Sequence, residues 1–391
     1  MKKTKYYSYK IGTLPKGCQL CVQGKKLVLF VTGLCPRCCY FCPISDKKYK
    51  KDVTYADEWP TKNIKDIIKE ANLIDAKGAG FTGGDPLCKL QITLSYIRTL
   101  KKEFGKDFHI HLYTSLDLID DKTLKKLYKA GLDEIRFHMD LDNNKLWNKI
   151  KLALKYNWKV GVEIPSIPKS QKQEVSEGLE TKSQSKEKQT KKLIDFLSKT
   201  NIGFLNINEL EIADNKVSQL SKLGYKTKNE LSYAIKGSEE LALKLLKYCK
   251  GKIKNVHYCT ATLKDKVQLA NRIKRRAKNI ARPFDIINKE GTLTRGVIYL
   301  KELKPSFNYR SKIDGINKRK RKDMLKKLRI IKDKIKKDYK IKSNLIEIDK
   351  KKLRIVTSKN IVKKIKKEGL VLAIVEEYPT YDQIELNVEF I

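Results

Sequence analysis

Three cysteines near the N-terminus have the spacing of iron–sulfur cluster ligands. Cys35, Cys39 and Cys42 form a C-x3-C-x2-C pattern directly after an apolar run, within the sequence GLCPRCCYFC. Three thiolates on one tight loop can each bind one iron of a [4Fe–4S] cubane, which leaves the fourth iron open to a substrate or cofactor. Cys38 complicates the register, because Cys35 and Cys38 also have a metal-ligand spacing. Only Cys35, Cys39 and Cys42 supply three ligands from one short loop.

A second cysteine pair precedes this loop. Cys18 and Cys21 form a C-x2-C pair, which is a common half-site for zinc or for an auxiliary iron–sulfur cluster. A complete second metal site would need partners, and the candidates are His257, Cys259 and Cys38. The alternative is a pair of half-buried thiols without metal. The sequence leaves both interpretations open.

A glycine-containing turn is the second motif that indicates a chemical function. Gly83, Gly84 and Asp85 follow an apolar run in the sequence FTGGDP, and Phe41 stands immediately before Cys42. The cysteine pattern and this turn together resemble the radical S-adenosylmethionine (SAM) superfamily. Within it, the sequence is most similar to archaeal proteins related to pyruvate formate-lyase activating enzyme.

This resemblance covers residues 27 to about 261 and implies an enzyme, its cofactors and a reaction. It implies that Cys35, Cys39 and Cys42 bind the [4Fe–4S] cluster, that Phe41 flanks the SAM adenine, and that Gly83, Gly84 and Asp85 hold the SAM methionine end. Asp85 replaces the glutamate usual in this turn, which contacts SAM through its main chain. The implied reaction reduces SAM by one electron to methionine and a 5′-deoxyadenosyl radical, which abstracts hydrogen. A ferredoxin- or flavodoxin-type reductant is the implied partner.

Polar residues at the ends of later predicted strands could contact SAM or the substrate. We prefer Glu163 and Asn208 as cofactor-binding residues, because a carboxylate or amide facing the cavity can hold vicinal hydroxyls. The other candidates are His138, Asn206, Glu209 and Glu211. The alternative is that these side chains form polar layers inside a barrel or hydrogen bonds within loops.

The elements that would position these motifs alternate between strands and helices. The predicted strands are 27–31, 80–82, 109–114, 134–138, 160–164, 204–207 and 256–259, with helical apolar periodicity between several of them. Such alternation indicates a parallel sheet, and six consecutive βα repeats favour a partial (β/α)6 barrel of the TIM type. Both motifs then lie at the C-terminal ends of strands, where barrel active sites are built.

The chain divides into three predicted parts. Residues 1–26 are an N-terminal segment with the cysteine pair, and residues 27–282 are the barrel. Within the barrel, residues 168–192 predict a flexible insertion because they are rich in Lys, Glu, Gln, Ser and Thr. Residues 283–391 predict a small basic α+β domain with the β-α-β-β-α-β order of the ferredoxin-like fold, and an extra strand at 384–390.

The composition is that of a soluble globular protein with a large basic excess. Of 391 residues, 40% are hydrophobic and 34% charged, and 86 Lys and Arg against 45 Asp and Glu give a formal net charge of +41. There is no run of about 18 apolar residues, so we expect no membrane-spanning helix. The basic N-terminal start lacks the apolar core of a secretory signal, and we expect a cytoplasmic location.

The basic excess has two interpretations. Arg272, Arg275 and Arg276 cluster on one predicted helix, and residues 318–340 form another helix with 13 basic and 3 acidic residues. Arginine suits phosphate groups, so these helices could dock RNA. The alternative is a solvated charged face produced by composition.

Three functions follow from these observations. The resemblance favours a radical SAM enzyme acting on an unidentified protein or metabolite, similar to an activating enzyme. The alternative is a radical SAM enzyme that modifies RNA or tRNA and docks it through the basic helices. A non-enzymatic, metal-stabilised RNA-binding protein is a third candidate, against which the open-iron motif argues.

Overall fold

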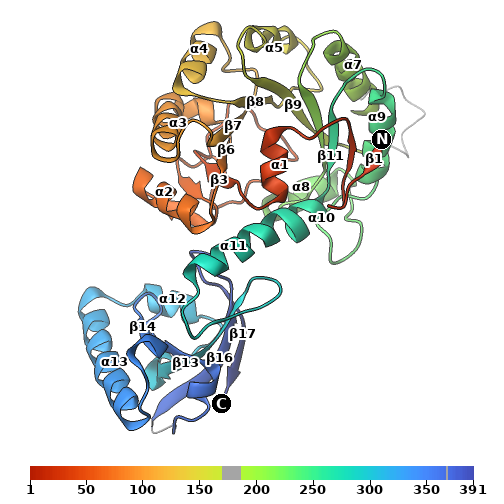
Figure 1. The fold of residues 1–391 in the computed structure, drawn as a ribbon. Helices are drawn as coiled ribbons and strands as arrows, with labels where there is room; N and C mark the ends of the chain where they lie inside the picture. The colour runs from red at the N-terminus through yellow and green to blue at the C-terminus, as the bar shows by residue number, and fades with distance from the viewer. Residues whose placement is uncertain (170–185, 367–368) are drawn as a thin grey trace. The chain divides into compact units, whose positions relative to one another are not determined.

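The structure is a computed structural model that describes residues 1–169, 186–366 and 369–391. Contacts divide the chain into two compact units, Met1–Arg272 and Ile273–Ile391 (Figure 1). The predicted boundary between residues 282 and 283 lies further along the chain. The difference arises because most of α11 (Ala270–Ile280) packs with the second unit, where Arg276 donates a hydrogen bond to the carbonyl of Pro379.

The core of the first unit is an open sheet whose seven central strands are parallel. Their order in the sheet follows the chain, and all seven strands predicted from the sequence are present. The sheet curves into a partial barrel of the TIM type, with helices outside it (Figure 1). The strands are β3 (Leu27–Phe30), β6 (Gly78–Thr82), β7 (His109–Thr114), β8 (Glu134–Phe137), β9 (Lys159–Ser166), β10 (Phe204–Glu209) and β11 (Val256–Cys259).

Short antiparallel strands extend both ends of this sheet. Beyond β11 lie β2 and then β1, and beyond β3 lie β4 and then β5. Their bounds are β1 (Lys2–Lys3), β2 (Tyr9–Ile11), β4 (Thr54–Ala56) and β5 (Trp59–Thr61).

The outer helices are amphipathic and have defined ends. The side chain of Asn63 caps α2 by accepting a hydrogen bond from the amide of Asp66, and Asp120 caps α4 in the same way. Their inner faces bury aliphatic side chains against the sheet, such as Ile67 and Leu124. The helices are α2 (Ile64–Leu73), α3 (Leu90–Phe104), α4 (Asp121–Ala130), α5 (Ile150–Ala153), α7 (Lys186–Ser198), α8 (Val217–Lys222), α9 (Ser238–Cys249) and α10 (Ala261–Leu263).

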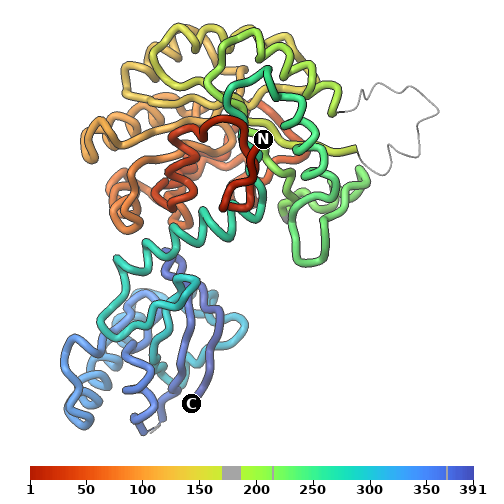
Figure 2. The backbone as a smooth tube through the Cα atoms, turned by 45° about the vertical axis from the view of Figure 1, so that its right-hand side comes forward, coloured from red at the N-terminus to blue at the C-terminus, as the bar shows by residue number. Residues whose placement is uncertain are grey.

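Helix α1 (Lys16–Val22) has a different place from the outer helices. It lies across the middle of the barrel strands in both views and contacts β6 and β7 (Figure 1, Figure 2). The amide of Gly17 donates to Glu134 on β8 at 3.3 Å, and a Cβ at Gly17 would overlap the Arg136 guanidinium. The N-terminal segment therefore packs against the polar interior of the barrel.

The predicted flexible insertion was too long at its C-terminal end. Residues 170–185 lie outside the described residues, but residues 186–192 form the first half of α7. Thr190 is buried, and its hydroxyl donates to the carbonyl of Lys186 at 2.7 Å. Buried Leu193 and Ile194 hold the helix on the barrel, so the polar composition of its first turns marks a solvated face.

The second unit is an antiparallel sheet with helices. Its strand order is β14-β15-β13-β16-β17, with β12 paired to β13. The second helix of the predicted β-α-β-β-α-β order is α14, which has four residues. The elements are β12 (Ile286–Ile287), β13 (Leu293–Leu300), α12 (Tyr309–Asp314), α13 (Lys318–Asp338), β14 (Ile346–Asp349), β15 (Arg354–Thr357), α14 (Lys359–Val362), β16 (Leu370–Glu377) and β17 (Glu385–Phe390).

Candidate active site

The cysteine loop begins directly after β3 and is closed at its base. The amide of Gly33 donates to the carbonyl of Lys51 at 2.8 Å, so the chain returns to its starting point. Inside this loop the amide of Cys42 donates to the carbonyl of Cys39 at 3.2 Å. Cys35, Cys39 and Cys42 are all half-buried and unpaired. The loop therefore carries three partly accessible thiols on one short segment.

Burial keeps these thiols protonated when no metal is bound. Burial raises the pKa of Cys35 to about 12, and it also raises the pKa values of Cys39 and Cys42. A thiolate is therefore unfavourable here unless a cation compensates it, which bound iron would do. Within residues 1–169, 186–366 and 369–391, no three His, Cys, Asp or Glu side chains converge on a single metal ion. A cubane needs no such convergence, because each thiolate binds a different iron.

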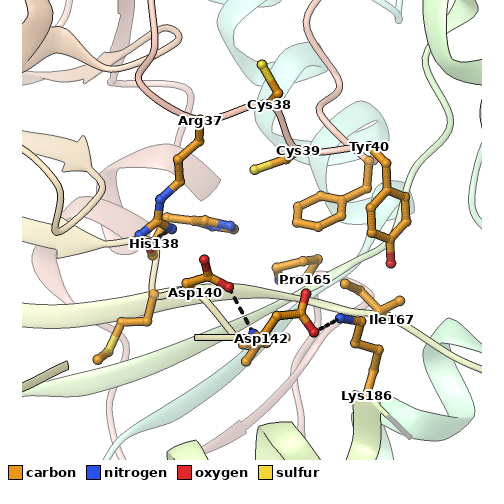
Figure 3. Close-up of a pocket in the computed structure, with 13 residues that line it drawn as sticks. Arg37, Cys38, Cys39, Tyr40, His138, Asp140, Asp142, Pro165, Ile167 and Lys186 are labelled. Carbon is orange, nitrogen blue, oxygen red and sulfur yellow. Dashed lines mark hydrogen bonds and ion pairs between the residues drawn. The ribbon is translucent and has the colours of Figure 1, made fainter. Parts of the chain in front are cut away.

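Cys38 lies differently from its neighbours. It is the exposed cysteine of the loop, and its sulfur points away from the other labelled side chains, whereas the sulfur of Cys39 points toward Arg37 and His138 (Figure 3). This arrangement supports the predicted register, in which Cys38 is left out of the ligand set.

The glycine turn after β6 runs in contact with the start of the cysteine loop. The amide of Gly84 donates to the carbonyl of Thr32 at 2.8 Å, and the amide of Asp85 donates to the carbonyl of Leu34 at 2.7 Å. A Cβ at Gly83 or Gly84 would overlap these carbonyl oxygens, and Gly83 has φ +148°. Only glycine permits this approach. The two sequence motifs are thus joined through their main chains.

The side chain of Asp85 anchors the turn to the end of β7. Its buried carboxylate accepts hydrogen bonds from the amide of Leu87 at 3.0 Å, the hydroxyl of Thr114 at 2.8 Å, and the amide and hydroxyl of Ser115 at 3.0 and 2.8 Å. The side chain of Asp85 therefore holds the turn in place, and its oxygens are occupied by these donors. The shorter aspartate reaches all these donors.

A cavity of about 260 Å³ opens beside Cys39, next to the ends of β8 and β9 (Figure 3). Phe41 lies on one side of it, with its ring 5.9 Å from the ring of His138. Burial, with a further contribution from Arg37, lowers the pKa of His138 to about 4, so its ring is neutral near pH 7. The remaining apolar lining residues are Tyr40, Met139, Leu141, Pro165 and Ile167.

The structure brings the preferred pair, Glu163 and Asn208, together inside the barrel. The amide of Asn208 donates to Glu163 Oε1 at 2.9 Å, and the amide of Asn206 donates to Oε2 at 2.9 Å. Arg136 donates to Oε2 at 3.0 Å. Burial by itself would raise the pKa of Glu163, but Arg136 and the two amides outweigh it and lower the pKa. Glu163 is therefore an ionised carboxylate already held by three donors.

The central member of this network, Arg136, was not predicted. Its guanidinium is almost fully buried and donates to Glu134 at 2.6 Å as well as to Glu163. The sequence contained a signal, because Glu134, Arg136 and His138 alternate with apolar residues along one strand. In a barrel strand such alternation directs every second side chain to the interior.

The structure places the N-terminal cysteines against this same network. Cys18 is buried, and its sulfur accepts hydrogen bonds from Arg136 at 3.5 Å and from Asn206 at 3.4 Å. Among the described residues, neither Cys18 nor Cys21 belongs to a group of three metal-ligating side chains. Of the candidate partners, His257 instead lies 3.3 Å from the hydroxyl of Ser8. The second metal site stays a prediction.

The predicted arginine cluster is engaged within the protein. Arg272 forms ion pairs with Asp57 at 3.0 Å and Glu58 at 2.6 Å, and its side chain is 15% exposed. Arg276 is buried, and Arg275 is half-buried and also has an interaction partner. Residues distant in sequence therefore neutralise Arg272 and cover Arg276, which leaves little of either side chain exposed. The docking of RNA by this cluster stays a prediction.

Comparison with known proteins agrees with this geometry. The sequence profile described as the radical SAM superfamily matches residues 29–174. A protein of Methanocaldococcus jannaschii, provisionally named a glycyl-radical enzyme activating enzyme, is 42% identical over 303 residues, which cover 75% of this chain and 76% of that protein. The chain belongs to the radical SAM superfamily. The resemblance carried by the cysteine and glycine motifs is thereby confirmed.

Two solved structures show weaker similarity to this superfamily member. Methylornithine synthase has a TM-score of 0.37 at 13% identity, covering 58% of this chain and 63% of that one, which is less than two thirds of its length. Coproporphyrinogen III oxidase from Escherichia coli has a TM-score of 0.29 at 11% identity, covering 89% and 91%. At these values neither similarity supports a functional conclusion.

No helix within the described ranges has the length and apolar character needed to cross a membrane.

Proposed function

We propose that the protein is a radical SAM enzyme that abstracts hydrogen from a protein or metabolite substrate, in the manner of an activating enzyme. The observation that carries this proposal is the main-chain contact between the cysteine loop and the glycine turn, in which Gly84 bonds to Thr32 and Asp85 to Leu34. Family membership supports the chemistry, and the name of the M. jannaschii relative supports the class of reaction.

The cluster would be held by Cys35, Cys39 and Cys42, and when bound it would supply one electron for the cleavage of SAM. The hydrogen bond that closes the base of the loop keeps the three cysteines within one short segment, which supports this ligand set. Their raised pKa values favour neutral thiols until iron binds, so loading the cluster would release protons.

SAM would lie between the glycine turn and the cavity beside Cys39. The main chain of Gly83 and Gly84 would hold its methionine end, while Asp85 keeps the turn in place from behind. Phe41 and the neutral ring of His138 would flank the adenine, since the cavity is apolar and aromatic on that side. A neutral His138 adds no charge repulsion against the cationic sulfonium.

The polar interior would orient the ribose or the substrate. Asn208 is the member nearest the C-terminal strand ends, two residues beyond Asn206, which is paired with Glu163. The donors on Glu163 hold its carboxylate in one orientation. Arg136 balances the charge of Glu134 and Glu163, so the interior keeps an ionised carboxylate without an unpaired charge.

We also propose that residues 283–391 form a ferredoxin-like domain. The antiparallel strand order β14-β15-β13-β16 supports this assignment, because it is the order that two split β-α-β units generate. The extra strand β17 then extends the sheet at β16.

Anaerobic reconstitution tests the enzymatic proposal. With dithionite and SAM, the reconstituted protein should release methionine and 5′-deoxyadenosine. Cys38→Ala is a matched control in the same loop and should retain this activity, whereas Cys39→Ala should lose it. Activity that survives in Cys39→Ala and disappears in Cys38→Ala would move the ligand set to Cys38. Absence of 5′-deoxyadenosine from cluster-loaded wild-type protein would contradict the proposal.

A further inference from the structure

A lysine-rich surface lies on and beside the cysteine loop. Residues 43–51 contain four lysines and one acidic residue, and residues 216–228 contain four lysines and no acidic residue. Lys228 is paired with Glu209 and Glu239 and does not contribute. Lys48 lies over the rings of Phe30 and Tyr55 and is left out as well. We use the term lysine face for the six remaining lysines of these two segments, namely Lys47, Lys50, Lys51, Lys216, Lys222 and Lys226.

The two segments form one continuous surface. The side-chain amide of Asn215 donates to the carbonyl of Ile44 at 2.7 Å. The Lys216 ammonium lies 4.9 Å from the centre of the Tyr49 ring, and the Lys50 ammonium lies 5.5 Å from the same ring. A small apolar cluster underneath fixes this arrangement, since buried side chains around α8 pack against two aromatic residues of the cysteine loop. These side chains are Leu220, Tyr225, Tyr40 and Phe41.

The lysine face lies beside the part of the chain that carries Cys42. Ile44, which accepts the hydrogen bond from Asn215, is two residues after Cys42, and Phe41, which precedes Cys42, packs in the apolar cluster beneath α8. Tyr49, between Lys50 and Lys216, shares a hydrogen bond with Cys38. A partner seated on this face would therefore sit directly over the loop that would hold the cluster.

The charges of the lysine face are not compensated within the described part of the chain. Lys47, Lys51, Lys222 and Lys226 are exposed, and the described residues provide no ion pair for any of them. Two apolar side chains stand among them, Val217 at 44% and Leu223 at 41% exposure. An apolar centre with a charged rim is typical of protein interfaces, and small interfaces of this kind suit brief redox encounters.

We propose that the lysine face is the docking site of an acidic one-electron carrier protein that reduces the cluster. This inference rests on the proposed function, because it needs a cluster to reduce. One electron leaves the carrier, which is oxidised, and enters the cluster, which is reduced, and no bond forms or breaks. A negatively charged carrier is attracted to the six lysines, which raises its association rate, and the carrier then needs only a weak complex to deliver the electron. The face holds no arginine for bidentate phosphate contacts, so its chemistry favours a carboxylate-rich protein over a nucleic acid.

Charge-neutralising variants test the docking site by kinetics. Lys47→Gln/Lys51→Gln/Lys222→Gln removes three exposed charges from the face. A matched control removes three exposed charges from the outer helix α4, at Lys125, Lys126 and Lys129. Stopped-flow reduction of the reconstituted full chain by an acidic reduced ferredoxin should slow about tenfold at low salt in the first variant only. Reduction by cationic methyl viologen should not slow in either variant. Equal slowing in both variants, or in neither, would overturn the proposal.

Cross-linking tests the same site without a loaded cluster. A carbodiimide joins lysines to carboxylates in contact, so the apoprotein mixed with oxidised ferredoxin should give cross-links at Lys47, Lys51 and Lys222. These cross-links should weaken with added salt, because screening reduces the attraction. Cross-links confined to α4 or to α13 would contradict the docking site. Excess tRNA should leave the cross-links at Lys47, Lys51 and Lys222 undiminished, and their loss in its presence would favour a nucleic acid as the occupant of this face. Failure to form 5′-deoxyadenosine with dithionite would instead count against the proposed function, so the two failures are distinguishable.

Discussion

The cysteine loop and helix α1 are two cysteine-bearing segments with similar spacing and different surroundings. In the loop, Cys39 and Cys42 stand on irregular backbone that is closed at its base, and a glycine turn lies alongside. On α1, Cys18 has the same two-residue spacing to Cys21, but its sulfur is packed against donors from Arg136 and Asn206. Spacing alone does not distinguish these segments.

The difference teaches that the environment of a thiol decides what its spacing means. Burial raises the pKa of Cys21 to about 12, as it does that of Cys35. The pKa values therefore do not separate the two segments either. What separates them is that the loop carries a third cysteine, Cys35, on the same short segment, whereas the sulfur of Cys18 already accepts hydrogen bonds from the barrel interior.

The largest expected effect is the loss of SAM cleavage when a cysteine of the loop is replaced. Cys35→Ala or Cys42→Ala should lower the rate of 5′-deoxyadenosine formation by at least about 100-fold, because two thiolates do not hold a cubane. Cys18→Ala is the matched control on α1 and should retain the activity. Equal losses in Cys18→Ala and Cys35→Ala would remove the distinction between the two segments. The rate is measured by chromatography of the quenched reaction.

Removal of Arg136 should break the network that surrounds Cys18. Arg136→Ala leaves Glu134 and Glu163 buried without their cation, and loss of one partner from a buried pair costs about 3–5 kcal/mol. The free energy of unfolding, from urea denaturation of the apoprotein, should fall by that amount. Arg37→Ala, which breaks a partly exposed pair with Asp117, should cost no more than about 1 kcal/mol. Similar losses in both variants would contradict the buried network.

Acid should destabilise the barrel through its histidines. Burial lowers the pKa of His138 and of His257 to about 4, below the ordinary value of about 6.5. The stability associated with neutral rings is complete above pH 6.5 and is lost as the pH falls toward 4. Each such histidine contributes a slope of up to about 1.4 kcal/mol per pH unit between these limits. Urea denaturation at pH 7 and pH 5 measures it, and His257→Gln should reduce the slope. If His257→Gln left the pH dependence of the free energy of unfolding unchanged, His257 would not be a ring that is kept neutral by burial.

The smallest expected effect concerns metal on α1. We expect the triple variant Cys35→Ala/Cys39→Ala/Cys42→Ala to fold and to contain almost no iron or zinc, because Arg136 and Asn206 already donate hydrogen bonds to the Cys18 sulfur. Cys18→Ser in this background should change the free energy of unfolding by only about 1 kcal/mol, the value of one hydrogen-bonding group. Elemental analysis that finds about one metal equivalent in the triple variant would restore the second metal site at Cys18 and Cys21.

The sequence was sufficient to predict the parts of the fold that depend on local patterns. All seven parallel strands follow from apolar runs alternating with helical stripes. The two motifs were placed together because the C-terminal ends of parallel strands share one edge. Glu163 and Asn208 were preferred as cofactor-binding residues from their places near strand ends. The structure brings them within hydrogen-bond distance of each other, and their contact with a cofactor stays a prediction.

The features that sequence did not reveal depend on contacts between distant residues. Arg272 was expected to face a polyanion, but Asp57 and Glu58, far away in the chain, pair with it. The packing of α1 against the barrel interior depends on Gly17 and Glu134, which no local pattern connects. The first turns of α7 have the composition of a solvated loop. In the structure they are part of a helix, which buried Leu193 and Ile194 hold on the barrel.

Electron paramagnetic resonance of the reduced protein, recorded before and after addition of SAM, tests the central claim most directly. If Cys35, Cys39 and Cys42 leave one iron open beside the glycine turn, the wild-type protein and Cys18→Ala should both give a [4Fe–4S]⁺ signal that SAM changes. In Gly84→Ala the cluster signal should remain, but SAM should no longer change it, because the added Cβ displaces the turn from Leu34. A signal that SAM leaves unchanged in the wild-type protein, or one that disappears in Cys18→Ala, would contradict the account.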